Sequence, residues 1–346
     1  MKIVVASAGH AAPHAGWAAI DELADLLVHY LGATLITPRR ADNGWARRLL
    51  GGSSSSWQPL DCAGGDVLIV VAHAPQDLSM IDAIANCRGK FGRIFGWVTD
   101  SYFTAGFGQA LERYDAITVT AHEDMAHPQA RHGVAVHQVY QGIDGLAWAP
   151  PSGAERAIDL IGFGRMPPSY HTHFAARFHP ASSRHLYLHS PLGHVTGPSV
   201  HLERGMLFKL LHRSRISLAF HLFVEPQGQR PRSMMVTSRW LESLLAGCVV
   251  AGKRPVSRMA DDMLCWNGAT VDLADDPHEA GDQLALLLAH DDRLHVQRRR
   301  NVREVLLRHD WRHRIVELCG HFKLEVPSAL RADQQRVLAL ADQFGP

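Results

Sequence analysis

The first half of the chain alternates short apolar runs with helical patterns. Residues 3–6 form a β-branched run of strand length, and residues 67–71 are apolar throughout, as expected of a strand buried on both faces. Between them, apolar side chains recur at three- and four-residue steps, which predicts a helix: Trp17, Ile20, Leu23, Leu27 and Leu31. Further strands are predicted at 33–37, 93–98, 116–120 and 134–139. This alternation predicts a parallel sheet covered by helices on both sides.

The alternation restarts after a turn-rich stretch, residues 142–153, that is rich in glycine and proline. Strands are predicted at 158–163, 185–189, 216–220, 249–251 and 270–273, with helices at 202–211, 234–246 and 279–288. The tail predicts helices at 301–307, 311–319 and 328–344, the last capped by Ser328 after Pro327, whereas 39–65 predicts a loop. We therefore expect an α/β protein with a first domain at 1–144, a linker at 145–156, a second domain at 157–326 and a final helix at 327–346.

Composition narrows the class of protein. The chain has 346 residues, enough for two domains, and its 46% hydrophobic content excludes disorder for the chain as a whole. The net charge of +1 gives no electrostatic case for binding nucleic acid. The 5 cysteines are scattered without a C-x-x-C pair, which argues against a disulfide framework or a cysteine zinc module. No signal peptide and no long apolar run is recognised, which predicts a cytoplasmic protein.

Candidate chemistry follows from the predicted sheets, because ligands of doubly wound sheets bind beyond the carboxyl ends of the strands. In the first half these positions hold His10, His73 and Asp100. In the second half they hold a G-x-G-R turn with Gly164 and Arg165, where glycines admit a phosphate to the backbone and arginine binds it bidentately. Neither half has a complete G-x-G-x-x-G with an acidic residue some 20 positions later, so a nicotinamide cofactor is not predicted.

The richest segment is residues 230–255. Arg230 and Arg232 precede a predicted helix, and helix N-termini attract phosphates. Glu242 falls on that helix among leucines, where a carboxylate needs a partner. A salt bridge to a neighbour such as Arg239 is the structural alternative to a binding role for Glu242.

These residues carry a resemblance to a known family. The run 238–250, Ser-Arg-Trp-Leu-Glu-x-x-x-Ala-Gly-Cys-Val-Val, resembles the donor-site helix of GT-B glycosyltransferases, in particular CgeB-like and glycosyl-transferase-group-1 proteins with S-x-R-x-x-E-x-x-x-x-G. The run 141–150, Gln-Gly-Ile-Asp-x-x-x-Trp-x-Pro, is similar to the N-G-V-D-x-x-x-F-x-P hinge of that family, and Gly162–Arg165 to its V-G-R. The resemblance implies two Rossmann-like domains facing a cleft, with the last helix crossing back to the first domain.

The resemblance also implies an activity: transfer of a sugar from a nucleotide-diphosphate sugar to the hydroxyl of a glycan or lipid-linked acceptor, in surface glycan or glycolipid synthesis. Glu242 would hold the ribose and Arg165 the diphosphate. The lysine that usually follows V-G-R in the family is not evident in this sequence, so phosphate binding is expected of Arg230 or Arg232. The implied donor site is Gly164, Arg165, Arg230, Arg232, Ser238 and Glu242. Enzymes of this fold typically need no metal or further cofactor, because a helix N-terminus and basic side chains stabilise the leaving diphosphate.

One departure from the family pattern bears on the stereochemistry of the sugar transfer. Retaining members carry E-x7-E, and the position eight before Glu242 is Met234, which favours an inverting reaction. An inverting transferase needs a general base for the acceptor hydroxyl. Asp100 is the first candidate, with His73 and His10 second. The structural alternatives are that Asp100 caps a helix beginning near Tyr102 and that His73 is a structural or solvent-facing histidine.

Other histidines and the basic clusters have less specific patterns. His309 and His313 share a helix face and His171-x-His173 is assigned to one face of a strand, but no third ligand follows by spacing, so no metal is predicted. The clusters at 298–300, Arg312 and Arg314 predict a solvated face; contact with anionic lipid at the inner face of the membrane is the alternative. A nucleotide-sugar epimerase and a non-catalytic nucleotide- or glycan-binding protein remain alternative functions, the latter because of Met234.

Overall fold

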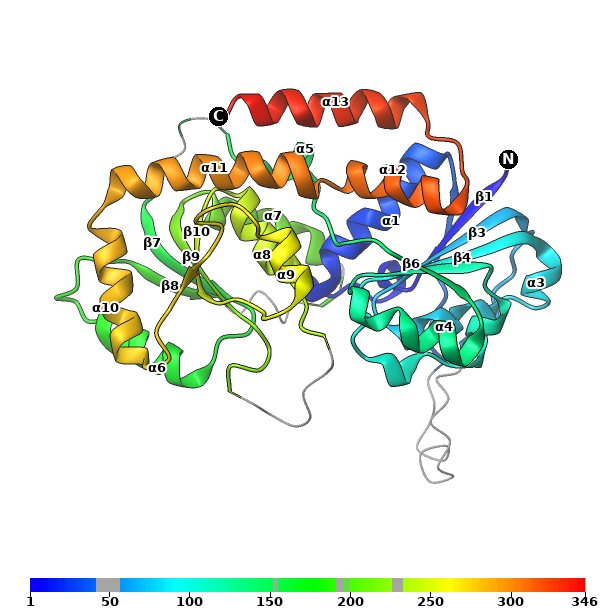
Figure 1. The fold of residues 1–346 in the computed structure, drawn as a ribbon, viewed down its shortest axis with the longest axis horizontal. Coiled ribbons are helices and arrows are strands. Elements are labelled where there is room, and N and C mark those ends of the chain that lie inside the picture. Colours follow the sequence, from blue (N-terminus) through cyan, green and yellow to red (C-terminus); the bar gives the residue numbers. More distant parts are fainter. Residues whose placement is uncertain are drawn as a thin grey trace. The chain divides into compact units, whose positions relative to one another are not determined.

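The computed structural model describes residues 1–41, 57–151, 153, 155–190, 196–197, 199–225 and 233–345. Arg230, Arg232 and most of the predicted loop at 39–65 lie outside these residues. The chain divides into two compact units (Figure 1). Unit 1 comprises Met1–Pro13, Ile20–Tyr140 and Glu317–Pro327, and unit 2 comprises His14–Ala19, Gln141–Val316 and Ser328–Pro346. Each unit is built on its own sheet, and each is described by itself.

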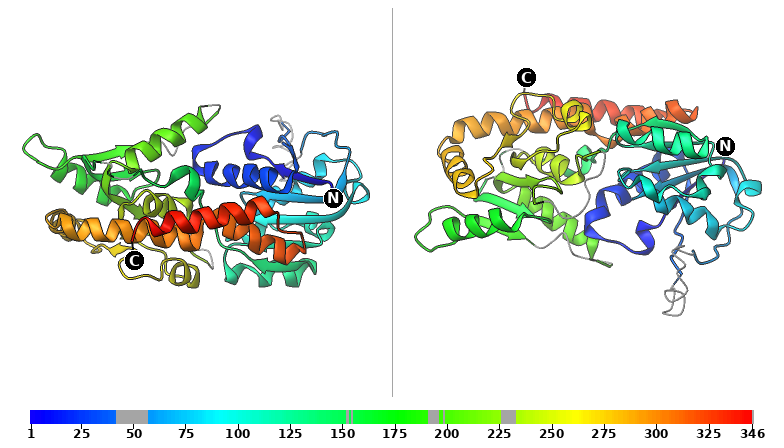
Figure 2. Two further views of the ribbon diagram at one scale, coloured as in Figure 1. Left: turned by 90° about the horizontal axis from the view of Figure 1, so that it is seen from above. Right: turned by 60° about the horizontal axis from the view of Figure 1, so that its bottom comes forward.

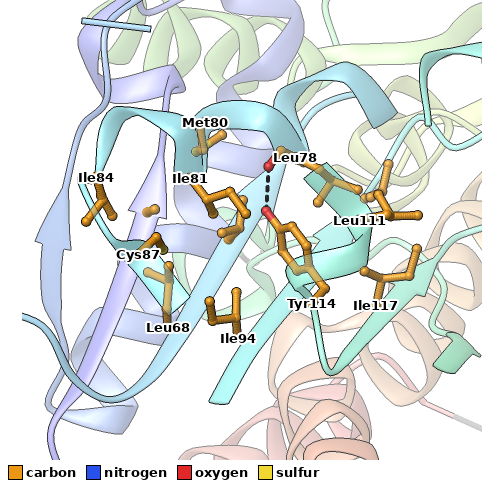
Figure 3. Close-up of a cluster of buried hydrophobic side chains, with 14 of the residues drawn as sticks. Leu68, Leu78, Met80, Ile81, Ile84, Cys87, Ile94, Leu111, Tyr114 and Ile117 are labelled. Atoms are coloured by element: carbon orange, nitrogen blue, oxygen red, sulfur yellow. Dashed lines mark hydrogen bonds between the residues drawn. The ribbon is translucent and has the colours of Figure 1, made fainter. Parts of the chain in front are cut away.

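The sheet of unit 1 has six strands in the order β2-β1-β3-β4-β5-β6, and each neighbouring pair is parallel. Its strands are β1 Ile3–Ser7, β2 Thr34–Ile36, β3 Gly65–Ala72, β4 Phe91–Val98, β5 Ala116–Val119 and β6 Ala135–Gln138. Its helices are α1 Ala18–Leu31, α3 Cys87–Lys90 and α4 Ala126–His132. Figure 3 shows one core of this unit, in which Tyr114 donates its hydroxyl to the Leu78 carbonyl at 2.6 Å. That bond lets a buried phenol join an otherwise apolar cluster.

The segment after β4 differs from the sequence-based expectation. No α-helix begins near Tyr102; two short 3-10 helices, Thr104–Gly106 and Gln109–Arg113, follow instead, and Phe103 precedes the first of them. Gly106 and Gly108 weaken a helix there, and no apolar stripe at helical spacing offsets that cost. The alternative that Asp100 caps a helix is therefore wrong.

The sheet of unit 2 has five strands in the order β11-β10-β9-β7-β8, again parallel throughout. Its strands are β7 Ile158–Phe163, β8 Tyr187–Ser190, β9 Ser214–Phe220, β10 Val249–Lys253 and β11 Val271–Asp272. Its helices are α5 Gly145–Trp148, α6 Pro168–Phe178, α7 Val200–Leu211, α8 Ser238–Leu245, α9 Arg258–Met263, α10 Pro277–Leu288, α11 Asp291–His309 and α13 Ser328–Asp342. Two parallel-sheet α/β units confirm the predicted fold class. His171 and His173 lie on α6, so the prediction that they share a strand is wrong.

The tail contributes to both units. Helix α12 (Trp311–Phe322) starts in unit 2, and its end belongs to unit 1, where Phe322 stacks on Phe95 with ring centroids 4.1 Å apart. Arg93 donates to the Phe322 carbonyl at 2.9 Å. Helix α13 belongs to unit 2 and lies along α11 (Figures 1 and 2). The chain therefore re-enters unit 1 at the end of α12, where Phe322 contacts Phe95 and Arg93. The last helix, which was predicted to cross back to the first domain, belongs to unit 2 instead.

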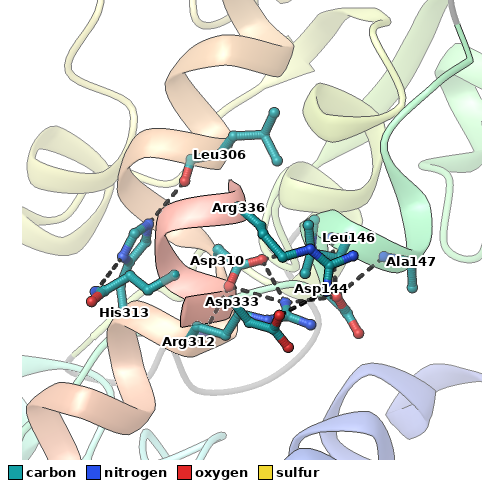
Figure 4. Close-up of polar contacts among 11 residues, drawn as sticks. Asp144, Leu146, Ala147, Leu306, Asp310, Arg312, His313, Asp333 and Arg336 are labelled. Carbon is teal, nitrogen blue, oxygen red and sulfur yellow. Dashed lines mark hydrogen bonds and ion pairs between the residues drawn. The ribbon is translucent and has the colours of Figure 1, made fainter. Parts of the chain in front are cut away.

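The predicted hinge is fixed within unit 2 by buried charges (Figure 4). Asp144 accepts from the Leu146 and Ala147 amides and so caps α5, and Arg312 donates to it at 2.8 Å. Asp310, between α11 and α12, accepts from Arg312 at 3.1 Å and from the Gly145 amide at 2.7 Å. Burial raises the pKa of the Asp310 carboxyl, against the opposing effect of Arg312. This ion-paired cluster ties the start of unit 2 to its tail.

Arg298 and Arg312 of the basic clusters are buried, contrary to the expectation of a solvated face, whereas Arg299 is exposed. Arg298 and Arg312 are 8% and 4% exposed. Arg314 donates to the Arg308 carbonyl at 3.0 Å and contacts His309 Nδ1 at 3.0 Å. The contacts of Arg314 join the start of α12 to the end of α11. Among the described residues, no helix is both long and apolar enough to cross a bilayer.

Candidate donor and acceptor sites

The first element of the donor-side candidate is the turn after β7. Gly164 has a φ of +63°, which favours glycine, and a Cβ there would lie 2.5 Å from Arg239 Nη2 and displace that guanidinium. Arg239 reaches this turn from α8 and donates to the Arg165 carbonyl at 2.5 Å. Its guanidinium also lies over the Phe163 ring, 5.5 Å from the centroid. Arg239 therefore fixes the loop that carries Arg165, whose side chain is exposed.

This corner of unit 2 is positively charged. Burial lowers the pKa of the Arg239 guanidinium to about 10, and the nearby charge of Arg165 acts in the same direction, while Glu242 opposes both. The Arg165 and Arg239 charges therefore lie close enough to repel each other at the turn after β7. An anion bound beside them would relieve their mutual repulsion, which is the electrostatic requirement for holding a diphosphate.

The second element is the start of α8. Ser238 is its first residue, later than the predicted start at 234, because Thr237 is extended. Ser257 donates to the Met234 carbonyl at 2.7 Å, which helps hold the preceding segment away from helical geometry. The helix buries Trp240, Leu241, Leu244 and Leu245. Thr237 makes no side-chain cap, and the partial positive charge of a helix N-terminus favours a negative ligand beside Arg239.

Glu242 makes a different contact from the one expected. Its Oε1 accepts from Arg204 of α7 at 2.6 Å, so its partner is not Arg239. Both side chains are buried, at 5% and 4% exposure, and the Arg204 guanidinium lies over the rings of Trp148 and Phe208. Among the described residues, no second group bonds to this carboxylate. The pair leaves Oε2 as the oxygen able to accept from a ligand.

The acceptor-side candidates meet at one edge of the sheet in unit 1. The Asp100 amide donates to the His73 carbonyl at 2.7 Å, which joins the ends of β3 and β4. His10 follows β1 in a 3-10 turn and contacts Asp25 Oδ1 at 2.9 Å. The hydrogen bond with Asp25 raises the pKa of His10, and the charges of Asp25 and Asp21 add to it. The structure thus brings His10, His73 and Asp100 to the same edge, as parallel strands dictate.

Three residues of these sites escaped the sequence analysis or were given another role there. In the sequence, Asp21 looks like an ordinary acidic residue in the first turn of a helix. Arg204 looks like a solvent-facing residue of α7. Arg239 entered only as a partner for Glu242. A charged residue flanked by apolar positions on a helix is the signal available in each case. Its partner, however, lies on another element and cannot be read from spacing.

The predicted histidine pair on α11 and α12 makes backbone contacts. Nε2 of His309 bonds to the Met263 carbonyl at 2.7 Å, and Nε2 of His313 to the Leu306 carbonyl at 2.9 Å. Within the described ranges, no group of three or more His, Cys, Asp or Glu side chains is arranged to hold a metal ion.

Comparisons with known proteins bear on the class of protein to which the chain is similar. Residues 177–320 match a family model described as "Glycosyl transferase-like", and this segment contains Arg204, Arg239 and Glu242. No curated protein matches the chain. Among solved structures, Anabaena Alr3699/HepE in complex with UDP-glucose is 11% identical, with 93% of this chain and 99% of that chain covered and a TM-score of 0.54. An alpha-glucosyltransferase in complex with UDP and a 13-mer DNA containing a HMU base is 10% identical, with coverage of 92% and 98% and a TM-score of 0.55.

At these identities the structural likeness shows the fold. The two parallel-sheet units are those of the GT-B fold, and the second unit carries the glycosyl transferase-like sequence pattern. The predicted GT-B fold is thereby confirmed, and residues 177–320 are similar to a glycosyl transferase-like family.

Proposed function

We propose that the protein transfers a sugar from a nucleotide-diphosphate sugar to an acceptor hydroxyl. One observation carries the proposal: Arg165 and Arg239 lie together at the start of α8, and Glu242 is anchored one turn further along that helix. Positive charge next to a carboxylate matches a diphosphate next to ribose hydroxyls. That HepE was solved with UDP-glucose and the alpha-glucosyltransferase with UDP supports a donor of this kind.

The donor residues have separate roles in this proposal. Glu242 accepts from the ribose hydroxyls through Oε2, while Arg204 holds Oε1 and fixes the carboxylate. Arg165 binds the diphosphate, and Arg239 adds charge and positions the Gly164 turn. Ser238 presents the helix N-terminus. Arg230 and Arg232 are further phosphate ligands on sequence grounds.

These charges also serve the reaction itself. When the sugar leaves, negative charge builds on the diphosphate, and the guanidinium groups and helix N-terminus stabilise it without a metal. On the acceptor side, Asp100 and His73 are the main candidates to meet the hydroxyl, and His10 is the third. Met234 in place of the first glutamate of E-x7-E supports an inverting outcome. A glycan or a lipid-linked precursor is the acceptor class, and a lipid-linked one would bring the protein to the cytoplasmic face of a membrane.

The test compares ligands that differ only in phosphate. We expect UDP to raise the melting temperature more than UMP, and UMP more than uridine. At a concentration 100 times the Kd, a ligand adds about 2.7 kcal/mol to the free energy of unfolding. Release of UDP from UDP-glucose, with water as the acceptor, then separates a transferase from an epimerase, which interconverts sugars, and from a binding protein, which does neither. If UDP, GDP, ADP and dTDP all leave the melting temperature unchanged, the proposal fails.

A further inference from the structure

The end of α12 belongs to a short segment that returns the chain to unit 1. Residues 317–327 are part of unit 1, whereas the residues on either side of them are part of unit 2. Phe322 is 1% exposed and stacks on Phe95 of β4, and its carbonyl accepts from Arg93 of the same strand at 2.9 Å. A contact beside Phe322 therefore influences how firmly this segment docks on the sheet of unit 1.

The contact beside Phe322 is a pair of histidines. The ring of His321 stacks on the ring of His137 of β6, with the ring centroids 4.4 Å apart and the ring planes at 19° to each other. Neutral imidazole rings attract each other in this arrangement, as other stacked aromatic rings do. Two imidazolium rings in the same arrangement repel each other, because each carries a positive charge. Whether this contact holds the segment or pushes it away therefore depends on pH.

The charged groups around the histidine pair do not balance two positive charges. On α12, Glu317 lies 3.9 Å from Nε2 of His321 and can offset the charge of one imidazolium. On β4, Arg93 adds a positive charge to the same docked segment. On β5, the residue that pairs with His137 is Thr118, which carries no charge. Protonation of both rings therefore leaves an excess of positive charge between β6 and α12.

The pKa of His137 has the direction that this repulsion requires. Burial lowers the pKa of His137 from its ordinary value of 6.5, and the charge of His321 lowers it further. The docked segment therefore binds fewer protons than the released segment, so the docking is complete above pH 6.5 and weakens as pH falls below it. The residues after α12 do not offset the excess charge, since Lys323 and Glu325 carry one charge of each sign and both are exposed.

We propose that His137 and His321 form a pH-sensitive latch, which holds residues 317–327 on unit 1 when both rings are neutral and releases them when both are protonated. Release detaches the end of α12 from β4 and β6, while α11 and α13 stay in unit 2. The latch goes beyond the proposed sugar transfer, since it needs neither a donor nor an acceptor.

Hydrogen–deuterium exchange of the whole protein tests the latch without a substrate. The protection factors of the amides in 317–327, corrected for the intrinsic effect of pH, are compared at pH 7.5 and pH 5.0, with the amides of β4 as a reference for global loss of structure. We expect them to fall about tenfold in the unaltered protein, the effect of a shift of one pKa unit. His137→Phe keeps a stacking ring that cannot be protonated, so its protection factors should stay nearly constant. The matched control is His29→Phe, because His29 is a histidine of unit 1 that packs on Tyr30, and it should behave like the unaltered protein.

The second test measures the coupling of the two rings. In protein labelled with ¹⁵N-histidine, the signals lost in His137→Phe are those of His137, and their shifts give its pKa. His321→Phe removes the neighbouring charge, so the pKa of His137 should rise toward 6.5. An unchanged pKa of His137 in His321→Phe, or an equal loss of protection in His137→Phe and the unaltered protein, would overturn the latch. If a phenylalanine variant does not fold, His137→Gln and His321→Gln give the same comparison, since glutamine cannot be protonated either.

Discussion

Arg204 and Glu242 form a buried ion pair, with Nη1 of the arginine 2.6 Å from Oε1 of the glutamate. Arg204 lies on α7 and Glu242 lies on α8, one turn after Ser238, so the ion pair joins the two helices. Glu242 therefore has two roles in our proposal: it neutralises a buried guanidinium through one oxygen and binds ribose through the other. Because breaking a buried pair leaves the remaining charge uncompensated, substitutions of Glu242 must be tested for stability and binding separately.

Glu242→Gln should weaken UDP binding at least about tenfold, since charge-assisted bonds from ribose are each worth about 1.5–3 kcal/mol. It should also lower the free energy of unfolding by about 3 kcal/mol, because Arg204 loses its counter-charge. Calorimetry with UDP and urea denaturation measure the two effects.

The control is the double variant Arg204→Met with Glu242→Gln, which removes both charges. We expect it to be more stable than Glu242→Gln alone while UDP binding stays weak. If the double variant binds UDP like the unaltered protein, Glu242 supports the fold and does not contact the ligand.

Arg165→Ala should weaken binding of UDP about tenfold and leave binding of uridine unchanged, since a guanidinium contributes only where a phosphate charge meets it. Arg177→Ala is the matched control, because Arg177 is another arginine of unit 2 that reaches solvent, but it pairs with Asp282. That variant should bind both ligands normally. Equal losses of UDP and uridine in Arg165→Ala would mean that the side chain maintains the Gly164 turn instead.

The sequence patterns predicted the sheets well because their central strands are apolar on both faces, as in residues 67–71. Once parallel sheets are expected, the positions after the strands follow. The edge in unit 1 that holds His10, His73 and Asp100 was therefore predicted before any contact was known. The start of α8 beside Arg165 follows from the same rule.

Contacts between elements could not be predicted in this way. Arg204 and Glu242 are 38 positions apart, and although the spacing of α7 places Arg204 on the face of Val200 and Leu207, it does not indicate which residue pairs with it. The burial of Asp21 could not be predicted either, because an acidic residue in the first turn of a helix is ordinary. The sequence predicts a solvent-exposed Arg312, whereas the structure pairs it with Asp144 and Asp310. Burial of charge depends on tertiary packing, which periodicity alone does not reveal.

His309 should make stability depend on pH. Burial lowers its pKa to about 3 from an ordinary value of 6.5, with the charge of Arg314 as the next cause. Its Nε2 bonds to the Met263 carbonyl and its Nδ1 faces Arg314, so only the neutral ring fits both partners. The folded state thus binds fewer protons than the unfolded chain below pH 6.5.

The contribution of His309 is fully present above pH 6.5 and is lost as pH falls toward 3, by about 1.4 kcal/mol per pH unit. Urea denaturation between pH 7.5 and 4.5 measures this slope. His309→Gln should be less stable at pH 7.5 but should have a shallower slope. Parallel slopes in the two proteins would assign the acid sensitivity to other groups.

Asp100→Asn and His73→Gln together decide which residue at the acceptor-side edge takes the proton. The main-chain bond from the Asp100 amide to the His73 carbonyl survives both substitutions, so neither should disturb the backbone of this edge. His73→Gln should cut kcat for release of UDP from UDP-glucose by about 10²–10⁴-fold, the usual contribution of a general base. Asp100→Asn should cost less than about tenfold, with donor KM unchanged in both. The reverse ranking would make Asp100 the base.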